Sequence, residues 1–118
     1  MYGLTKVYNE LLGRYYNMKY GVDFRCLRYP GIISSEEYEY HGTTDYSTEI
    51  FFKALREKSY TSYLRADTPL PLIHMDDAVK ATIQFLSADN STLTRRVYNL
   101  AGMSLTPNQF VDEIKKYL

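Results

Sequence analysis

The hydrophobic and polar positions along the chain alternate between helix-like and strand-like spacings. Over residues 3–19 the apolar positions recur every three or four residues, which is the spacing of one helix face. Residues 22–28 place apolar side chains at alternate positions between Gly21 and Pro30, and this pattern predicts a strand. Residues 29–44 are broken by glycine, proline and serine and predict a long loop, which in compact domains is usually functional or mobile.

The rest of the chain continues this alternation. We expect a helix from Thr44 or Asp45 to about Lys58, short strands at 60–64 and 70–74, a helix from Asp76 to about Ser87, and a strand at 96–100. A last helix is expected to begin at Thr106-Pro107-Asn108-Gln109, because this order matches a capping box with proline at the first helical position. Helices and strands in alternation predict an α/β fold with a parallel sheet.

That sheet has few strands for its class. A parallel sheet needs both of its faces and both of its edges covered, and one clear strand with three short ones does not achieve this. We therefore expect the chain to be part of a larger α/β protein or a truncated gene product. A small, complete α/β domain is the alternative.

Composition narrows the class of protein. The chain has 118 residues, of which 45% are hydrophobic and 24% charged, and these values are typical of one globular domain rather than of a disordered or fibrous chain. Fourteen basic residues balance fourteen acidic ones, so we expect neither nucleic acid nor a membrane as partner. The single cysteine, Cys26, cannot form an internal disulfide, and no metal site is expected because one cysteine and two histidines give no zinc-like spacing.

Tyr2 and Lys6 form the first chemically suggestive pair. Their separation of four positions brings both side chains to one face of a helix. An ammonium group beside a phenol favours the phenolate, which can take a proton from an alcohol. An ordinary exposed helix pair is the alternative, since the chain contains 13 tyrosines.

The surrounding order gives the pair a context. A helix opening with Tyr2-Gly3-Leu4-Thr5-Lys6, followed by a strand and by Leu27-Arg28-Tyr29-Pro30-Gly31-Ile32-Ile33-Ser34, resembles the extended short-chain dehydrogenase/reductase superfamily. Further stretches resemble the NAD-dependent L-threonine 3-dehydrogenases of that superfamily: Gly42-Thr43-Thr44-Asp45-Tyr46, Met75-Asp76-Asp77-Ala78 and the segment from Tyr98 to Pro107. The resemblance covers nearly the whole chain. It implies the C-terminal part of a Rossmann-like, doubly wound parallel sheet with a small substrate-binding subdomain.

The resemblance also implies roles in catalysis and cofactor binding. Residues 1–34 would carry the catalytic helix and a sheet strand, with Tyr2 as the general base. Lys6 would hold the nicotinamide ribose of NAD and stabilise the Tyr2 phenolate. The backbone of Pro30, Gly31 and Ile32 would face the nicotinamide.

A second set of roles concerns the substrate. Residues 35–118 would form the substrate-binding loop and subdomain, in which Thr43, Thr44 and Asp45 lie against L-threonine while it is oxidised to 2-amino-3-oxobutanoate. Hydroxyls and a carboxylate suit an amino acid, which carries an ammonium and a carboxylate. A plain helix N-cap is the alternative for these residues.

Two departures from the family pattern keep other functions open. The glycines are scattered, with no G-x-G-x-x-G after a strand, so the pyrophosphate motif would fall before Met1 and the isolated chain would be inactive. The segment from Ser35 to His41 carries glutamates and tyrosines where the family is richer in glycine and proline. A nucleotide-sugar epimerase or dehydratase and a non-catalytic remnant that acts by association remain alternatives. The resemblance further implies a homodimer of the full-length protein, in mitochondria or cytoplasm.

Overall fold

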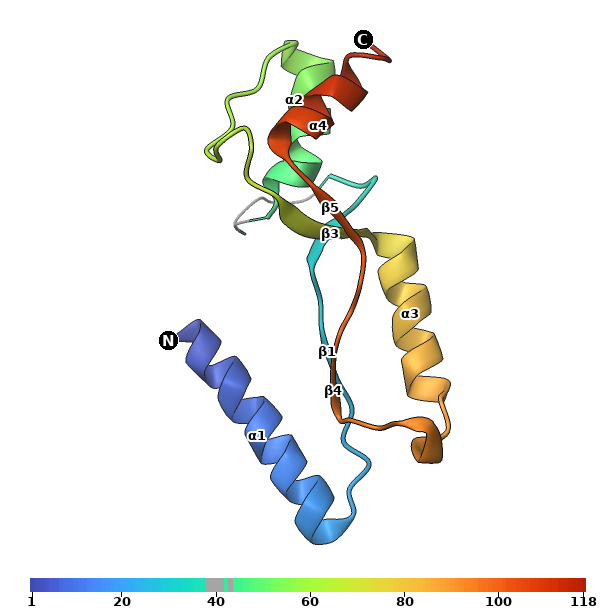
Figure 1. Cartoon of the computed structure of the whole chain (residues 1–118). Coiled ribbons are helices and arrows are strands. Elements are labelled where there is room, and N and C mark those ends of the chain that lie inside the picture. The colour runs from blue at the N-terminus through green and yellow to red at the C-terminus, as the bar shows by residue number, and fades with distance from the viewer. Residues whose placement is uncertain (38–41, 43) are drawn as a thin grey trace. The chain divides into compact units, whose positions relative to one another are not determined.

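The computed structural model of the chain describes residues 1–37, 42 and 44–118 (Figure 1). The elements follow in the order α1 (Tyr2–Tyr20), β1 (Cys26–Arg28), β2 (Gly31–Ile33), α2 (Tyr46–Glu57), β3 (Leu70–His74), α3 (Met75–Ser87), the 3-10 turn η1 (Asn90–Thr92), β4 (Val97–Asn99), β5 (Met103–Leu105) and α4 (Pro107–Ile114). They form two compact units. The first contains residues 1–28 and 80–100, and the second contains residues 29–79 and 101–118.

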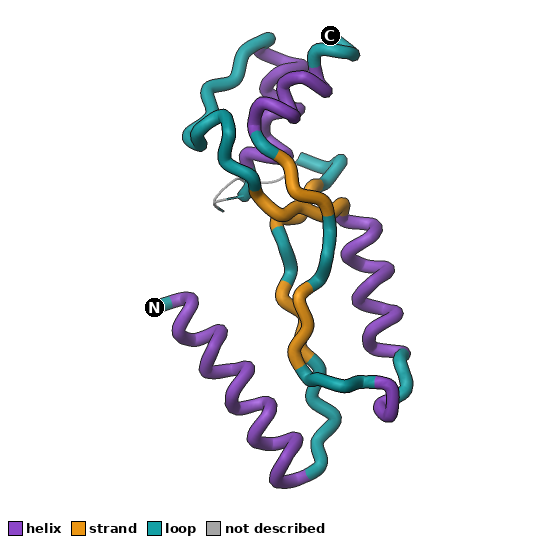
Figure 2. The backbone as a smooth tube through the Cα atoms, viewed as in Figure 1, coloured by secondary structure: helices purple, strands orange, loops and turns teal. Residues whose placement is uncertain are grey.

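The first unit is built on a parallel strand pair. Strand β1 runs parallel to β4, with Leu27 opposite Tyr98, and Figure 2 shows the two short strands next to one another. Helix α1 ends at Gly21, whose positive φ of 69° lets its N–H reach the Asn17 carbonyl. Within the described structure no residue of α1 is buried, so its apolar side chains are exposed.

Two contacts fix α1 to β1 and to the segment just before it. The guanidinium of Arg28 donates to both carboxylate oxygens of Glu10, at 2.7 and 2.6 Å, and this hydrogen bonding lowers the pKa of Glu10. The ring of Phe24 lies against Gly13, where a Cβ atom would come within 2.2 Å of the ring. A bidentate ion pair and a ring seated on a glycine therefore hold the helix in place.

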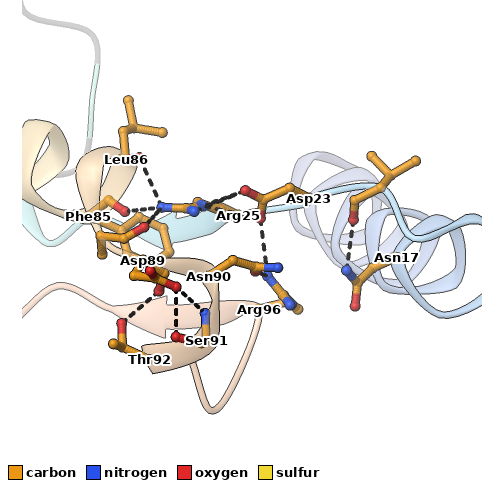
Figure 3. Close-up of polar contacts among 12 residues, drawn as sticks. Asn17, Asp23, Arg25, Phe85, Leu86, Asp89, Asn90, Ser91, Thr92 and Arg96 are labelled. Carbon is orange, nitrogen blue, oxygen red and sulfur yellow. Dashed lines mark hydrogen bonds and ion pairs between the residues drawn. The ribbon is translucent and has the colours of Figure 1, made fainter.

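Arg25 connects the start of β1 to the end of α3. Its guanidinium donates to the carbonyl oxygens of Phe85, Leu86 and Ala88 at 2.7, 2.9 and 2.8 Å (Figure 3). The same group pairs with Asp23, and the Arg25 side chain is only 10% exposed. The last carbonyls of a helix have no partner within the helix, so Arg25 supplies donors where α3 needs them.

We expect Arg25→Met to destabilise the first unit. The substitution keeps the aliphatic stem but leaves part-buried carbonyl groups without donors, which should lower the free energy of unfolding by about 2 kcal/mol. Arg65→Met is the matched control, because the Arg65 side chain is 83% exposed and pairs with the nearby Asp67. Urea denaturation of both variants measures the difference, and equal stabilities would contradict this role of Arg25.

The pH dependence of that stability should change as well. The hydrogen bond from Arg25 lowers the pKa of the Asp23 carboxyl. A carboxyl with a depressed folded-state pKa stabilises the fold above its unfolded-state pKa, and this stabilisation is lost as pH falls through the folded pKa. The free energy of unfolding should therefore fall less between neutral and acid pH in Arg25→Met than in the parent chain. Urea denaturation at several pH values measures this difference.

The second unit contains a mixed sheet covered by helices. Strand β2 runs parallel to β3, and β3 runs antiparallel to β5. Helices α2 and α4 and strand β3 supply the core, which consists of the buried residues Tyr46, Ile50, Leu72 and Phe110. The Tyr46 and Phe110 rings meet edge to face with centroids 5.8 Å apart.

Most predicted elements are confirmed, and the differences concern strands. The capping box of α4 is present, with Thr106 and Gln109 bonded reciprocally. The predicted strand at 60–64 is wrong, because Tyr60 and Leu64 pack on the helical core instead of alternating across a sheet. The predicted loop at 29–44 contains β2, and β5 was not expected. The α/β class with parallel strand pairs is confirmed.

Candidate functional site

Tyr2 and Lys6 lie together on the first turns of α1. The Nζ atom of Lys6 lies 5.1 Å from the centroid of the Tyr2 ring, as the spacing of four positions predicts. The Tyr2 side chain is exposed, and the Thr5 hydroxyl donates to the Tyr2 carbonyl at 2.7 Å. The structure therefore brings the two side chains of the predicted pair together on one exposed helix face.

The same helix contains a second pair with this spacing. Lys19 Nζ donates to the Tyr15 hydroxyl at 2.8 Å and lies 5.3 Å from the Tyr15 ring centroid. Local geometry alone therefore does not distinguish the two pairs. What distinguishes Tyr2 and Lys6 is the resemblance to the dehydrogenase superfamily, which rests on the stretch Tyr2-Gly3-Leu4-Thr5-Lys6 at the start of the helix.

A pocket in the second unit brings the other predicted residues together. Its volume is about 540 Å³, and it is lined by Pro30, Gly31, Ile32, Ser34, Glu36, Glu37, Thr44, Asp45 and Met75. The predicted nicotinamide wall and two of the three predicted substrate residues thus share one cavity. Thr43, the third, lies outside the described residues. Sequence reasoning did not assign Ser34, Glu36, Glu37 or Met75 to the site. It noted the segment from Ser35 to His41 only as a departure from the family pattern.

Gly31 determines how closely the two walls of the pocket approach. Gly31 is buried at the start of β2, and a Cβ atom there would lie 2.8 Å from Thr44 Cβ and 2.7 Å from Leu72 Cδ2. Only a residue without a side chain lets Thr44 approach the strand this closely. Glycine at this position therefore places Thr44 beside the backbone of β2.

Asp45 holds the loop in front of α2. One carboxylate oxygen accepts the N–H of Gly42 at 2.7 Å. Asp45 occupies the N-cap position of α2, as predicted, but its side chain forms no capping bond to the helix. The carboxylate instead lies in the wall of the pocket, where it can also meet a ligand.

The charged side chains among the described residues that line the pocket are all acidic. Three carboxylate side chains line it, those of Glu36, Glu37 and Asp45, and no lysine or arginine belongs to its described lining. Glu37 is paired with Arg56 through two contacts of 2.6 and 2.5 Å. An acidic lining of this kind favours a ligand with an ammonium group and disfavours one with phosphates.

Other kinds of site are not observed in the part of the chain that the structure describes. No group of three or more histidine, cysteine, aspartate or glutamate residues is arranged to hold a metal there. None of the described helices is both long enough and apolar enough to cross a membrane. The Cys26 thiol is half-buried, and burial raises its pKa, so this thiol is a weak nucleophile.

Comparison with known proteins shows to which family the chain is similar. The model of the NAD dependent epimerase/dehydratase family matches residues 1–101. The mitochondrial L-threonine 3-dehydrogenase of Bos taurus is 43% identical over 118 residues, which are all of this chain and 32% of the bovine protein. An epimerase/dehydratase of Staphylococcus haemolyticus without an assigned activity is 48% identical over 99% of this chain and 37% of its own length.

The solved structures agree with the sequence comparison. The crystal structure of L-threonine dehydrogenase from Phytophthora infestans superposes with a TM-score of 0.95 at 51% identity, over 98% of this chain and 38% of that one. The predicted fold class, part of a Rossmann-like α/β fold, is thereby confirmed. This chain spans about a third of the length of the curated relatives that it matches. The family model, the relatives and the superposed fold together show that the chain belongs to the NAD dependent epimerase/dehydratase family.

Proposed function

We propose that this chain is the part of an NAD-dependent dehydrogenase that binds L-threonine and removes the proton from its hydroxyl, yielding 2-amino-3-oxobutanoate. In this proposal residues 1–34 supply the base and the wall facing the nicotinamide, and residues 35–118 supply the substrate-binding loop and subdomain. The similarity to threonine dehydrogenases from cattle and from Phytophthora infestans supports the proposal.

The charge of the pocket in the second unit is the observation that carries the proposal. A lining with carboxylates and no lysine or arginine among its described residues attracts the ammonium of an amino acid. A nucleotide sugar carries a diphosphate, which the same lining would repel. The pocket thus favours threonine over the substrates of epimerases and dehydratases in the same family.

The residues present fit one end of NAD. Pro30, Gly31 and Ile32 give the pocket a backbone and aliphatic wall suited to a nicotinamide ring, and Lys6 is exposed beside Tyr2, suited to a ribose hydroxyl. The 118 residues contain no glycine-rich turn for the pyrophosphate. NAD, when bound, accepts the hydride from the carbon that carries the hydroxyl.

The chain's own residues would bind the substrate and move the proton. Tyr2, as phenolate, would take the proton of the threonine hydroxyl, and the nearby Lys6 ammonium would stabilise that phenolate. The Thr43 and Thr44 hydroxyls would donate hydrogen bonds to the substrate carboxylate. Asp45 would accept hydrogen bonds from the substrate ammonium.

A hybrid enzyme tests the proposal. In the hybrid dehydrogenase this chain replaces the matching segment of the Phytophthora infestans enzyme, which supplies the remaining length. We expect the hybrid to oxidise threonine with NAD and to leave nucleotide sugars unchanged, as followed by NADH absorbance and product analysis. The 118-residue chain alone is the control and should neither bind NAD at micromolar concentration nor turn over. Conversion of a nucleotide sugar but not threonine would refute the proposal.

Asp45→Asn in the hybrid dehydrogenase should weaken threonine binding. The amide keeps an oxygen that can accept the Gly42 N–H and removes only the charge that would meet the ammonium. Hydrogen bonds to charged groups contribute about 1.5–3 kcal/mol, so KM for threonine should rise at least about tenfold while KM for NAD stays unchanged. Asp67→Asn is the control, since Asp67 is exposed and pairs with Arg65. Equal KM values in the two variants would contradict the role of Asp45.

A further inference from the structure

Thr48 is a buried polar residue with an unusual partner. Its side chain lies in the first turn of α2 and is fully buried. The hydroxyl oxygen accepts the N–H of Ser34 at 3.2 Å, from a residue 14 positions earlier in the chain. A buried hydroxyl is unfavourable unless it is hydrogen-bonded. Here its hydrogen bond connects α2 to Ser34, the residue that follows β2.

Ser34 in turn hydrogen-bonds the backbone of Glu36. The Ser34 hydroxyl oxygen accepts the N–H of Glu36 at 3.0 Å, which turns the chain just after β2. Both residues line the pocket that contains Asp45. Thr48 thereby fixes Ser34, and Ser34 fixes the backbone of Glu36 at the wall of the pocket.

The two glutamates of this turn differ in their partners. Glu37 is neutralised by Arg56, with both carboxylate oxygens engaged. Among the described residues no ion pair or hydrogen bond engages the carboxylate of Glu36. The Glu36 carboxylate can therefore meet a ligand in the pocket that Asp45 also lines.

We propose that Glu36 is a specificity-determining residue that selects a substrate with an ammonium group, and that Thr48 is the positioning residue that holds Glu36 in place through Ser34. This inference rests on the proposed function, since it concerns the substrate of the same pocket. The substrate class is a β-hydroxy amine such as a 2-amino-3-hydroxy acid, and a hydroxy acid without the amine should be rejected.

Kinetics of the hybrid dehydrogenase test the role of Glu36. Glu36→Gln should raise KM for threonine about tenfold with little change in kcat, because a charge-assisted contact is lost without moving the base. The preference for threonine over 3-hydroxybutyrate should fall by a similar factor. Glu57→Gln, at the exposed end of α2, is the matched control. An unchanged preference in Glu36→Gln would overturn the role of Glu36.

The role of Thr48 is tested by coupling. Thr48→Val keeps the shape of the side chain and removes the acceptor of the Ser34 N–H, so it should also raise KM for threonine about tenfold. Because both residues act on one contact, Thr48→Val combined with Glu36→Gln should be no worse than the poorer single variant. Thr48→Ser should restore KM, and Thr61→Val, at an exposed position, is the control. Additive effects or a failure of Thr48→Ser to restore KM would overturn the role of Thr48.

Hydrogen exchange separates this inference from the proposed function. In the 118-residue chain the Ser34 amide should exchange about tenfold faster in Thr48→Val than in the parent, read by NMR. Unchanged exchange would show that Thr48 does not hold Ser34. A hybrid that does not oxidise threonine would refute the proposed function and with it the role of Glu36, whatever the exchange rates show.

Discussion

Replacing Tyr2 by phenylalanine in the hybrid dehydrogenase is expected to lower the turnover of threonine by about 10²–10⁴, the usual effect of removing a general base. The substitution keeps the ring over which Lys6 Nζ lies, at 5.1 Å from its centroid, and removes only the hydroxyl. The helix should therefore be unchanged, and KM for NAD should hardly change. Steady-state kinetics with threonine and NAD as varied substrates measure both quantities.

Tyr15→Phe is the matched control for this prediction. Tyr15 and Lys19 lie on the same helix with the same spacing and with a hydrogen bond of their own at 2.8 Å. Removing that hydroxyl should leave turnover unchanged, because the pair follows the predicted active-site turns by more than three helical turns. Near-normal turnover in Tyr2→Phe, or equal losses of turnover in the two variants, would mean that Tyr2 is not the general base.

Lys6→Met extends the prediction to the other member of the pair. Without the ammonium, the proposed base loses the positive charge nearest to its ring, so turnover of threonine should fall. Loss of the proposed ribose contact should weaken NAD binding. The effects of Tyr2→Phe and Lys6→Met on turnover should not add, because both residues act on one proton transfer.

The helices could be predicted because their determinants are local. The apolar spacing over residues 3–19 is a property of α1 itself, and the start of α4 depends on Thr106 and its neighbours within one turn. Strands β2 and β5 were missed because each has three residues and owes its pairing to β3, far away in the chain. Alternation over three residues is too short to distinguish a strand from a loop.

The candidate site could be predicted only where residues match a family pattern or share a loop. Pro30–Ile32 and Thr44–Asp45 were placed in one site by resemblance, and the structure brings them into one pocket. The bond from Thr48 to Ser34 depends on how α2 packs against β2, and no spacing in the sequence reveals it. The role of Arg25 at the end of α3 is equally tertiary, since its carbonyl partners lie 60 or more positions away.

The second large effect is expected at Gly102, just before β5. A Cβ atom there would lie 2.0 Å from the backbone oxygen of Leu72 and 3.1 Å from Ile73 Cβ. Because the obstacle is backbone of the central strand β3, it cannot rotate away as a side chain would. Gly102→Ala should therefore push β5 from β3 and lower the free energy of unfolding by about 3 kcal/mol, the upper range for overpacked sites.

Gly3→Ala separates this steric effect from the general effect of adding a methyl group. No atom lies within 4 Å of a Cβ at Gly3, which is in helix α1, so alanine there should stabilise the chain by about 0.5–1 kcal/mol. Urea denaturation of the two variants should thus give shifts of opposite sign. The Gly102→Ala shift should also reach the pocket, since Leu72 contacts Gly31, whose close approach to Thr44 joins its walls. A Gly102→Ala chain with parental stability would show that β5 can separate from β3 without loss, and that Gly102 is not required for their pairing.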